Sequence, residues 1–237
     1  EKQTINNWWI MKPERSSRGR GIRLVTDLDD VQYSESVVIQ KYITNPLLLD
    51  GYKFDLRLYV LVTSFQPLEA FLYQDGFARF ALDKFNTQDA KALNVHLTNS
   101  SVQQDRDDMK TKLAEMRPFL NASKDEVGGS KMSTAELWRQ LEHVGHDVKK
   151  IKHGIRECVL KSLMSVNHRI KSQESSFEIF GYDILIDTDL RSWLIEVNSS
   201  PSLGCSNALD IRIKDSLIRD TLELLNPIPF DRARLLR

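Results

Sequence analysis

The sequence predicts an α+β fold in which largely antiparallel sheets are flanked by helices. In the first half of the chain, residues 53–63 alternate between apolar and polar types, which is the period of a half-buried strand. In the second half, apolar residues recur every three or four positions over 148–166, the period of an amphipathic helix. Two strand-like runs, 177–187 and 193–197, then follow and are separated by a short turn, as in a hairpin.

The first half of the chain is expected to consist of strands and turns. An aromatic and aliphatic run over 7–11 ends at Lys12-Pro13, since proline disfavours continuation of regular structure. The dipeptide Asp75-Gly76 stands between two alternating runs and predicts a hairpin turn there. Further strands are expected over 22–25, 37–43, 68–73 and 77–81.

Helices are expected to dominate the second half. Residues 103–131 are polar and predict a long loop with some helix. Ser133 and Glu136 have the spacing of a capping box, which starts a helix that Gly145 can end. After the long helix and the hairpin, a last helix is expected over 209–225.

Composition excludes several classes of protein. Lys and Arg together number 33, and so do Asp and Glu, so the zero net charge argues against nonspecific binding to nucleic acid. No apolar stretch approaches the roughly 18 residues needed to span a membrane. The first residues are charged and amide-rich, so no signal peptide is expected, and two cysteines cannot form a disulfide framework, so a reducing, cytoplasmic compartment is expected.

The strongest chemical signal lies in the last hairpin. Glu196 and Asn198 are two apart on a strand, so their side chains point to the same face. A turn near residues 189 and 190 sets Asp183 opposite Glu196 on that face. Two carboxylates and an amide oxygen are hard ligands suited to Mg²⁺ that carries phosphates. The alternative is a polar surface face, which the apolar residues of these strands disfavour.

Other patterns are less specific. Lys53, Asp55 and Arg57 share one face of a strand, which fits either a binding site or a solvated face. Lys12 and the Ser/Arg/Gly loop over 16–21 could neutralise phosphate, although a glycine-rich turn is the commoner meaning. The segment 96–99 (His-Leu-Thr-Asn) could contact a ligand or simply form a turn. Basic residues along 149–171 could dock an acidic partner or face solvent.

Taken in order, these segments resemble the tubulin tyrosine ligase-like family of ATP-grasp amino-acid ligases, and within it the polyglutamylase branch. The matching segments are Trp-Ile-Met-Lys-Pro at 9–13, Ser-Arg-Gly-Arg-Gly-Ile at 17–22, Gln-Lys-Tyr-Ile at 40–43, Lys-Phe-Asp-Leu-Arg at 53–57, Phe-Ala-Arg-Phe at 77–80, His-Leu-Thr-Asn at 96–99, Phe-Gly-Tyr-Asp at 180–183 and Glu-Val-Asn-Ser-Ser-Pro-Ser at 196–202.

The resemblance implies an ATP-grasp-like fold and roles for individual residues. Arg57 would contact the γ-phosphate and act with Glu196 in catalysis, and Asp183, Glu196 and Asn198 would carry magnesium. The residues implied to bind ATP are Lys12, Arg18, Gly19, Gln40, Lys41, Tyr42, Ile43, Lys53, Asp55, Thr98 and Asn99. The residues implied to hold the incoming glutamate are Arg79, Ser100, Ser101, Lys131 and Lys214, with Ser100 standing where glutamylases usually have tyrosine.

The resemblance also implies an organisation and a function. Residues 1–46 would form a central ATP-grasp subdomain with the phosphate loop and the adenine strand, and residues 47–237 a C-terminal subdomain with the metal site. The family usually has a small α/β subdomain before the first matching segment, whereas only about eight residues precede it in this sequence and residue 1 is Glu, so either a fragment or a site without one of its walls is expected.

The expected activity is ATP- and Mg²⁺-dependent ligation of free glutamate to glutamate side chains of tubulin or another acidic protein tail. The expected location is the cytoplasm and the cytoskeleton, including the cilium or basal body. A glycine ligase of the same fold and an inactive nucleotide- or tubulin-binding module are the alternatives. A protein kinase is excluded because its catalytic sequences are absent.

Overall fold

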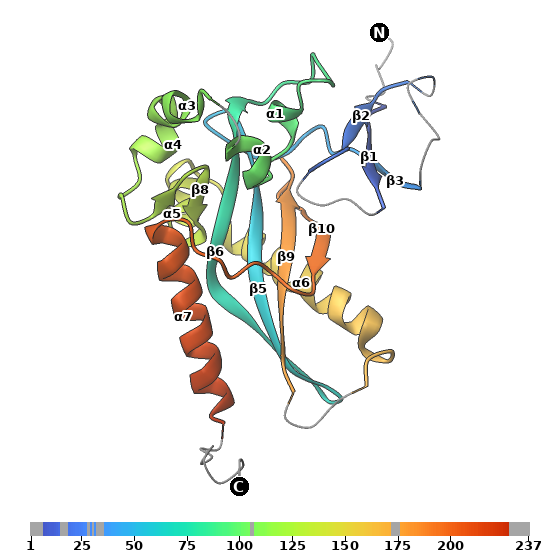
Figure 1. The fold of residues 1–237 in the computed structure, drawn as a ribbon, viewed down its shortest axis with the longest axis vertical. Coiled ribbons are helices and arrows are strands. Elements are labelled where there is room, and N and C mark those ends of the chain that lie inside the picture. The colour runs from blue at the N-terminus through green and yellow to red at the C-terminus, as the bar shows by residue number, and fades with distance from the viewer. Residues whose placement is uncertain are drawn as a thin grey trace, which may run out of the picture.

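Two antiparallel sheets organise the computed structural model, which describes residues 7–14, 19–27, 29, 31, 36–104, 107–171 and 176–227. The smaller sheet has three strands in the order β2-β1-β3, and the larger has seven, in the order β10-β9-β5-β6-β8-β7 with β4 paired to β5. Residue 46 lies between the last strand of the first sheet and the first strand of the second. Figure 1 shows the small sheet standing to one side of the large one.

Most strands lie where the sequence predicts them. The small sheet contains β1 (Trp9–Pro13), β2 (Arg23–Val25) and β3 (Val37–Lys41). The large sheet contains β4 (Leu48–Leu49), β5 (Tyr52–Phe65), β6 (Leu68–Lys84), β7 (Val127–Gly128), β8 (Lys131–Ser133), β9 (Glu178–Ile186) and β10 (Ser192–Asn198).

The hairpin expected at Asp75-Gly76 is wrong. Both residues lie inside β6, and the chain reverses at Gln66-Pro67 instead. The dipeptide coincides with a register shift between β5 and β6, because Leu58 pairs with Gly76 whereas Val60 pairs with Leu72. A side chain at position 76 would meet the Arg57 backbone oxygen at 2.5 Å, so glycine serves a close strand approach here and not a turn.

The polar segment 103–131 contains more regular structure than a loop with some helix. The short helices before and within it are α1 (Leu93–His96), α2 (Ser100–Gln104), α3 (Met109–Glu115) and α4 (Arg117–Leu120). Helices α1, α2 and α3 pack against β6, and α4 places Phe119 against Phe80 of the same strand, so tertiary contacts order a segment whose composition suggests a loop. They also cover one end of the large sheet (Figure 1).

The three longer helices agree with the sequence. They are α5 (Thr134–His143), α6 (Val148–Asn167) and α7 (Ala208–Leu225). The Ser133 hydroxyl accepts a hydrogen bond from the Glu136 backbone N–H, as the capping pattern predicts, and Asn226 ends α7 in the left-handed conformation. No described helix has the length and apolar character needed to cross a membrane.

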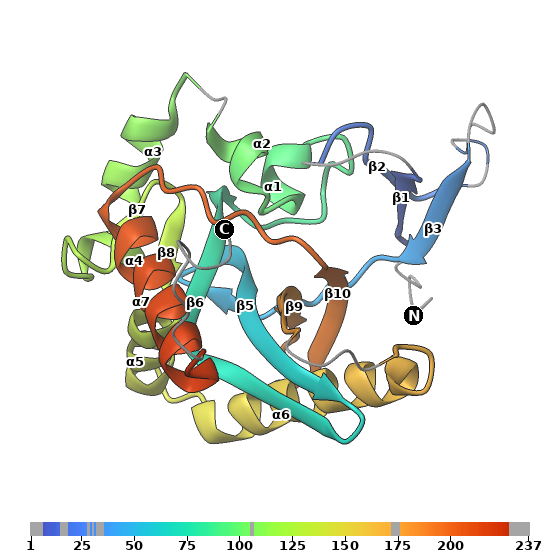
Figure 2. The same ribbon diagram turned by 60° about the horizontal axis from the view of Figure 1, so that its bottom comes forward.

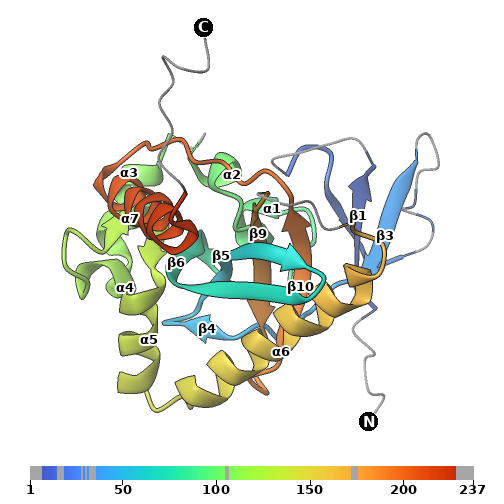
Figure 3. The ribbon, with the colours of Figure 1, turned by 90° about the horizontal axis from the view of Figure 1, so that it is seen from below.

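The main core lies between the large sheet and the helices α5 and α6. Phe54, Leu56 and Leu58 point to this face and pack with Ile151 and Ile155 of α6. Figure 2 shows α6 running beneath the sheet, and Figure 3 shows α5 and α6 on one side of β5 and β6 with α7 on the other. The opposite face of the sheet is therefore not covered by α5 and α6.

Candidate active site

A cavity of about 1230 Å³ opens on the sheet face that does not contact α5 and α6. The strand β5 lines it with every second residue, because alternate side chains of a strand point to opposite faces. These residues are Lys53, Asp55, Arg57 and Tyr59. Strands β1 and β3 of the small sheet form the opposing wall, and α7 closes one end.

A chain of alternating charges crosses three neighbouring strands at the floor of this cavity. The strand register places Asp55 of β5 opposite Arg79 of β6, and Arg57 of β5 opposite Asp183 of β9. Arg79 donates from Nε to Asp55 at 2.8 Å and from Nη2 to Asp183 at 2.8 Å. Arg57 donates to both Asp183 oxygens. Its Nε donates to Oδ1, and its Nη2 donates to Oδ2 at 3.0 Å. The four side chains form one ion-paired network.

The network keeps Asp183 and Arg79 charged despite their burial. Burial opposes ionisation of Asp183, but the hydrogen bonds and charges of Arg57 and Arg79 outweigh it and hold the pKa of this carboxyl below its usual range. Burial likewise opposes the charge on Arg79, while Asp55 and Asp183 raise its pKa above the ordinary value. The floor of the cavity thus carries fixed charges of both signs.

Lys53 is a buried cation whose hydrogen-bond partners are neutral. Its Nζ donates to the Tyr42 hydroxyl at 2.9 Å and to the His96 backbone oxygen at 2.6 Å. Burial lowers the pKa of Lys53 to about 8, although the charge of Asp55 acts in the opposite direction. A polyanion entering the cavity would stabilise the charged form of this side chain.

The hairpin β9–β10 arranges its polar side chains as the sequence predicts. Glu196 pairs directly with Asp183, next to a register shift that follows Leu194. Asn198 donates from Nδ2 to Glu196 Oε1 and to the Gly181 backbone oxygen, each at 3.3 Å. A side chain at Gly181 would meet Pro201 at 2.9 Å, so glycine lets the segment after β10 fold back over β9.

The β8 and α7 elements meet at another end of the cavity. Lys131 of β8 forms an ion pair with Asp210 of α7, and Lys214 Nζ lies 3.8 Å from the same carboxylate. Burial opposes ionisation of Asp210, but Lys131 and Ser206 lower its pKa below the usual range. Burial lowers the pKa of Lys214, more than Asp210 raises it.

The small sheet contributes the remaining expected residues. Lys12 of β1 donates to the Gln40 side chain of β3 at 3.2 Å. Gly19 has a φ of +76° and lies against the α2 region, where a side chain at this position would meet Val102 at 3.0 Å. Those of the expected ATP-binding residues that line the cavity are Lys12, Gly19, Gln40, Lys41, Tyr42, Ile43, Lys53, Asp55, Thr98 and Asn99.

The expected metal-binding, catalytic and glutamate-binding residues that line the same cavity are Arg57, Asp183, Glu196, Asn198, Arg79, Ser101, Lys131 and Lys214. Arg18 lies outside the described residues, and Ser100 begins α2 with a side chain that also lies outside them. Asp210 is a cavity residue that sequence reasoning missed. It stands three residues after the helix cap Asn207, and this position is typical of an ordinary helix start.

The donors in the cavity fit a magnesium nucleotide. Lysine and arginine side chains from β1, β5, β6, β8 and α7 surround the space, which suits a triphosphate. No group of three or more His, Cys, Asp and Glu side chains suited to a metal occurs among the described residues. Mg²⁺ typically binds one or two carboxylates and completes its coordination with phosphates and water, so Asp183, Glu196 and Asn198 fit a metal that arrives with the nucleotide.

Sequence comparisons find known proteins that are similar to this chain. The model of the tubulin-tyrosine ligase family matches residues 1–235. The chain is 37% identical over 239 residues to the human tubulin polyglutamylase TTLL5, an alignment that covers 95% of this chain and 18% of the relative. It is 35% identical over 245 residues to the mouse tubulin polyglutamylase TTLL6, covering 98% of this chain and 28% of that protein. The chain therefore spans well under half the length of these relatives.

Proposed function

The chain belongs to the tubulin-tyrosine ligase family, and we propose that it is an ATP- and Mg²⁺-dependent ligase that adds glutamate to glutamate side chains of tubulin. The relatives named as tubulin polyglutamylases support this choice of amino acid and acceptor. Residues 1–46 and 47–237 would serve as the two ATP-grasp subdomains that enclose the nucleotide. The cytoskeleton is the proposed location, and within it the cilium or basal body.

One observation carries the proposal. A single cavity brings together the cations that a triphosphate requires and the carboxylates that a phosphate-bound metal requires. Lys53 supports the nucleotide assignment most specifically, because it is buried and its hydrogen-bond partners are neutral oxygens. Such a cation is stabilised when a phosphate oxygen replaces or joins those partners.

The proposed nucleotide contacts divide between the two sheets. Lys12, Arg18 and Gly19 would hold or cover the phosphates, with Lys53 and Asp55 below them. The segment from Gln40 to Ile43 would line the adenine, and Thr98 and Asn99 would contact the nucleotide from the other side. Asp183, Glu196 and Asn198 would hold Mg²⁺, which when bound supplies positive charge to the phosphate oxygens.

The proposed reaction has two steps, and ATP is one of its substrates. An oxygen of the acceptor carboxylate attacks the γ-phosphorus, and the bond to ADP breaks, which gives an acyl phosphate. The amino group of free glutamate then attacks the acyl carbon, loses a proton and expels inorganic phosphate. Arg57 would neutralise charge that builds on the transferring phosphoryl group, a contribution that is often the largest in such chemistry.

The incoming glutamate is proposed to bind at the end of the cavity formed by β8 and α7. Lys131, Lys214 and Arg79 would meet its carboxylates, with Ser101 and Ser100 beside them. Removing a carboxylate from water is costly unless a cation receives it, so these residues favour glutamate over glycine. Arg79 already pairs with two aspartates, so it would contact glutamate while remaining part of that network.

Two alternative functions, a glycine ligase and an inactive binding module, are less well supported. A glycine ligase needs no cation for the side chain of its substrate, and the paired lysines at the β8–α7 end of the cavity weigh against it. An inactive module would bind nucleotide or tubulin without ligation, and the complete set of proposed metal ligands weighs against it.

Mass spectrometry of tubulin tails tests the proposal. Tubulin would be incubated with the chain, ATP and Mg²⁺, and with glutamate or glycine in separate reactions. We expect glutamate to be added only when both ATP and Mg²⁺ are present. Greater addition of glycine would establish the first alternative. Nucleotide binding without any addition would establish the second.

A further inference from the structure

Helix α7 contacts the β7–β8 region at two levels. The inner level faces the cavity and consists of the ion pair between Lys131 of β8 and Asp210 of α7. Lys214 lies one helical turn beyond Asp210 and belongs to the same level. Residues two apart on a helix point in nearly opposite directions, so Arg212 leaves α7 on the other side. Arg212 is not among the described residues that line the cavity.

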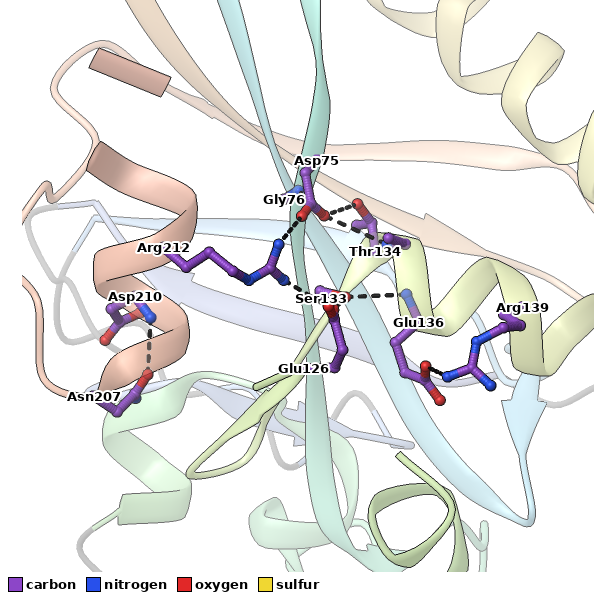
Figure 4. Close-up of polar contacts among 11 residues, drawn as sticks. Asp75, Gly76, Glu126, Ser133, Thr134, Glu136, Arg139, Asn207, Asp210 and Arg212 are labelled. Carbon is purple, nitrogen blue, oxygen red and sulfur yellow. Dashed lines mark hydrogen bonds and ion pairs between the residues drawn. The ribbon is translucent and has the colours of Figure 1, made fainter. Parts of the chain in front are cut away.

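The outer level is a bridge made by Arg212, which Figure 4 shows extending from α7 toward β6 and the start of α5. Its Nη2 lies 2.8 Å from Glu126 Oε2, and its Nη1 lies 3.3 Å from Asp75 Oδ2. The Arg212 side chain is 39% exposed, but those of Asp75 and Glu126 are only 15% and 25% exposed. A guanidinium that joins two carboxylates from different elements fixes orientation as well as charge.

Both carboxylates are themselves held in place at the start of α5. Asp75 accepts a hydrogen bond from the Thr134 hydroxyl at 2.8 Å, and Glu126 accepts one from the Ser133 hydroxyl. The Ser133 hydroxyl in turn caps α5 by accepting from the Glu136 N–H at 3.0 Å. Arg212 therefore joins α7 to the hydrogen-bonded residues at the start of α5.

Close packing supports the same contact. The Asn207 side chain caps α7 by accepting from the Asp210 N–H at 2.9 Å. The same side chain lies so near Gly128 of β7 that a Cβ there would clash with Asn207 Oδ1. Glu126 immediately precedes β7, so the first turns of α7 and the strand pair that carries Lys131 are joined at several points.

We propose that Arg212 is a positioning residue, which through Glu126 and Asp75 sets the distance between Lys131 and the Asp210–Lys214 pair and so tunes the pocket for the incoming amino acid. This inference rests on the proposed function for its substrate, but the geometry of the bridge is independent of it. The outer bridge and the inner ion pair both join α7 to the same side of the large sheet, because Asp75 lies on β6 and Lys131 lies on β8, which pairs with β6. Breaking the Arg212 bridge should therefore change the distance between Lys131 and Asp210.

The test compares Arg212→Gln and Arg212→Lys with the unmodified chain. We expect Arg212→Gln to raise the KM for glutamate about fivefold, the size typical of a lost, partly exposed ion-pair network, while kcat and the KM for ATP stay within about twofold. Arg212→Lys should recover part of the loss, because it keeps the charge but loses the paired geometry. Glu126→Gln should act in the same direction, and the double variant should be no worse than the stronger single one.

Controls separate this effect from general destabilisation and from failure of the proposed function. Lys161→Gln removes an exposed ion pair with Glu157 on α6, and should leave all kinetic constants unchanged. Hydrogen exchange of the amides in 208–214 should rise in Arg212→Gln whether or not the chain ligates glutamate. An unchanged KM for glutamate in a folded variant, or unchanged exchange, overturns the proposal. Absence of ligation by the unmodified chain would instead contradict the proposed function alone.

Discussion

The two faces of the strands β5, β6 and β9 differ sharply in chemistry, although the same stretches of chain supply both. On the face toward α5 and α6, Leu56, Phe80 and Ile184 are fully buried and apolar. On the face toward the cavity, Asp55, Arg79 and Asp183 are almost as deeply buried and are charged. One face binds helices and the other holds an ion network.

A sheet can hold buried charges on one face when apolar contacts on its other face stabilise the fold. Burying apolar side chains on one face stabilises the fold by about 1.5–3 kcal/mol for each. Burying charges is unfavourable unless each meets a partner of opposite sign with good geometry. The register of the strands supplies these partners, because it sets Asp55 opposite Arg79 and Arg57 opposite Asp183.

The sharpest test of the cavity face is Glu196→Gln, which removes charge but little volume from an exposed strand position. If the proposed function holds, ligation should fall by about a hundredfold or more, the scale of losing one strong electrostatic contact in a transition state. The melting temperature should not change. Glu178→Gln, an exposed position on the adjacent strand β9, is the matched control and should keep full activity. Near-normal activity of Glu196→Gln at limiting Mg²⁺ would contradict its role.

A substitution on the apolar face should instead lower stability and leave substrate binding nearly unchanged. Leu56→Ala creates a cavity at a side chain with no exposure, and should lower the free energy of unfolding by about 2–5 kcal/mol. Denaturant unfolding measures this loss. At a temperature where the variant stays folded, the KM values for ATP and glutamate should remain near those of the unmodified chain. A large rise in either KM without loss of stability would show that the faces are not separable.

Arg79→Ala touches both properties, because this side chain belongs to the cavity and to the buried network. We expect the KM for glutamate to rise about tenfold, the size of a lost charged hydrogen bond. Stability should also fall, since Asp55 loses its arginine partner. Arg79→Lys keeps the charge and is the variant to use if Arg79→Ala does not fold. A fall in kcat with an unchanged KM would mean that Arg79 organises the network and does not hold glutamate.

A smaller effect is expected from pH. Burial lowers the pKa of Lys53 from 10.5 to about 8, so this side chain loses its proton as the pH rises through about 8. ATP affinity should therefore decrease above that pH, by about tenfold for one lost charged hydrogen bond. Isothermal titration across this range measures it, and the affinity of Lys53→Met should be lower and independent of pH there.

Lys53 also affects the stability of the fold. Rising pH should weaken ATP binding but raise the free energy of unfolding. Between about pH 8 and 10.5 the folded chain binds fewer protons at Lys53 than the unfolded chain. The free energy of unfolding should then rise with pH across this window. If the contribution of Lys53 to the free energy of unfolding fell as the pH rises, burial could not be the cause of its lowered pKa.

Local patterns predicted much of the fold and the outline of the site. The alternation in β5, the stripe on α6 and the facing pair Asp183 and Glu196 follow directly from spacing. The error at Asp75-Gly76 arose because a glycine needed for close strand approach has the same local signature as a turn glycine. Asp210 and Arg212 could not be found from sequence, because their roles depend on partners 79 and 86 residues away.

The transfer of oxygen from the acceptor to phosphate reports whether the cavity forms an acyl phosphate. An acceptor peptide whose glutamate side-chain carboxylate carries ¹⁸O would be incubated with the chain, ATP, Mg²⁺ and glutamate. If the cavity face activates that carboxylate as an acyl phosphate, one labelled oxygen should appear in inorganic phosphate for each glutamate added. Addition of glutamate with unlabelled phosphate would contradict the proposed chemistry of this face.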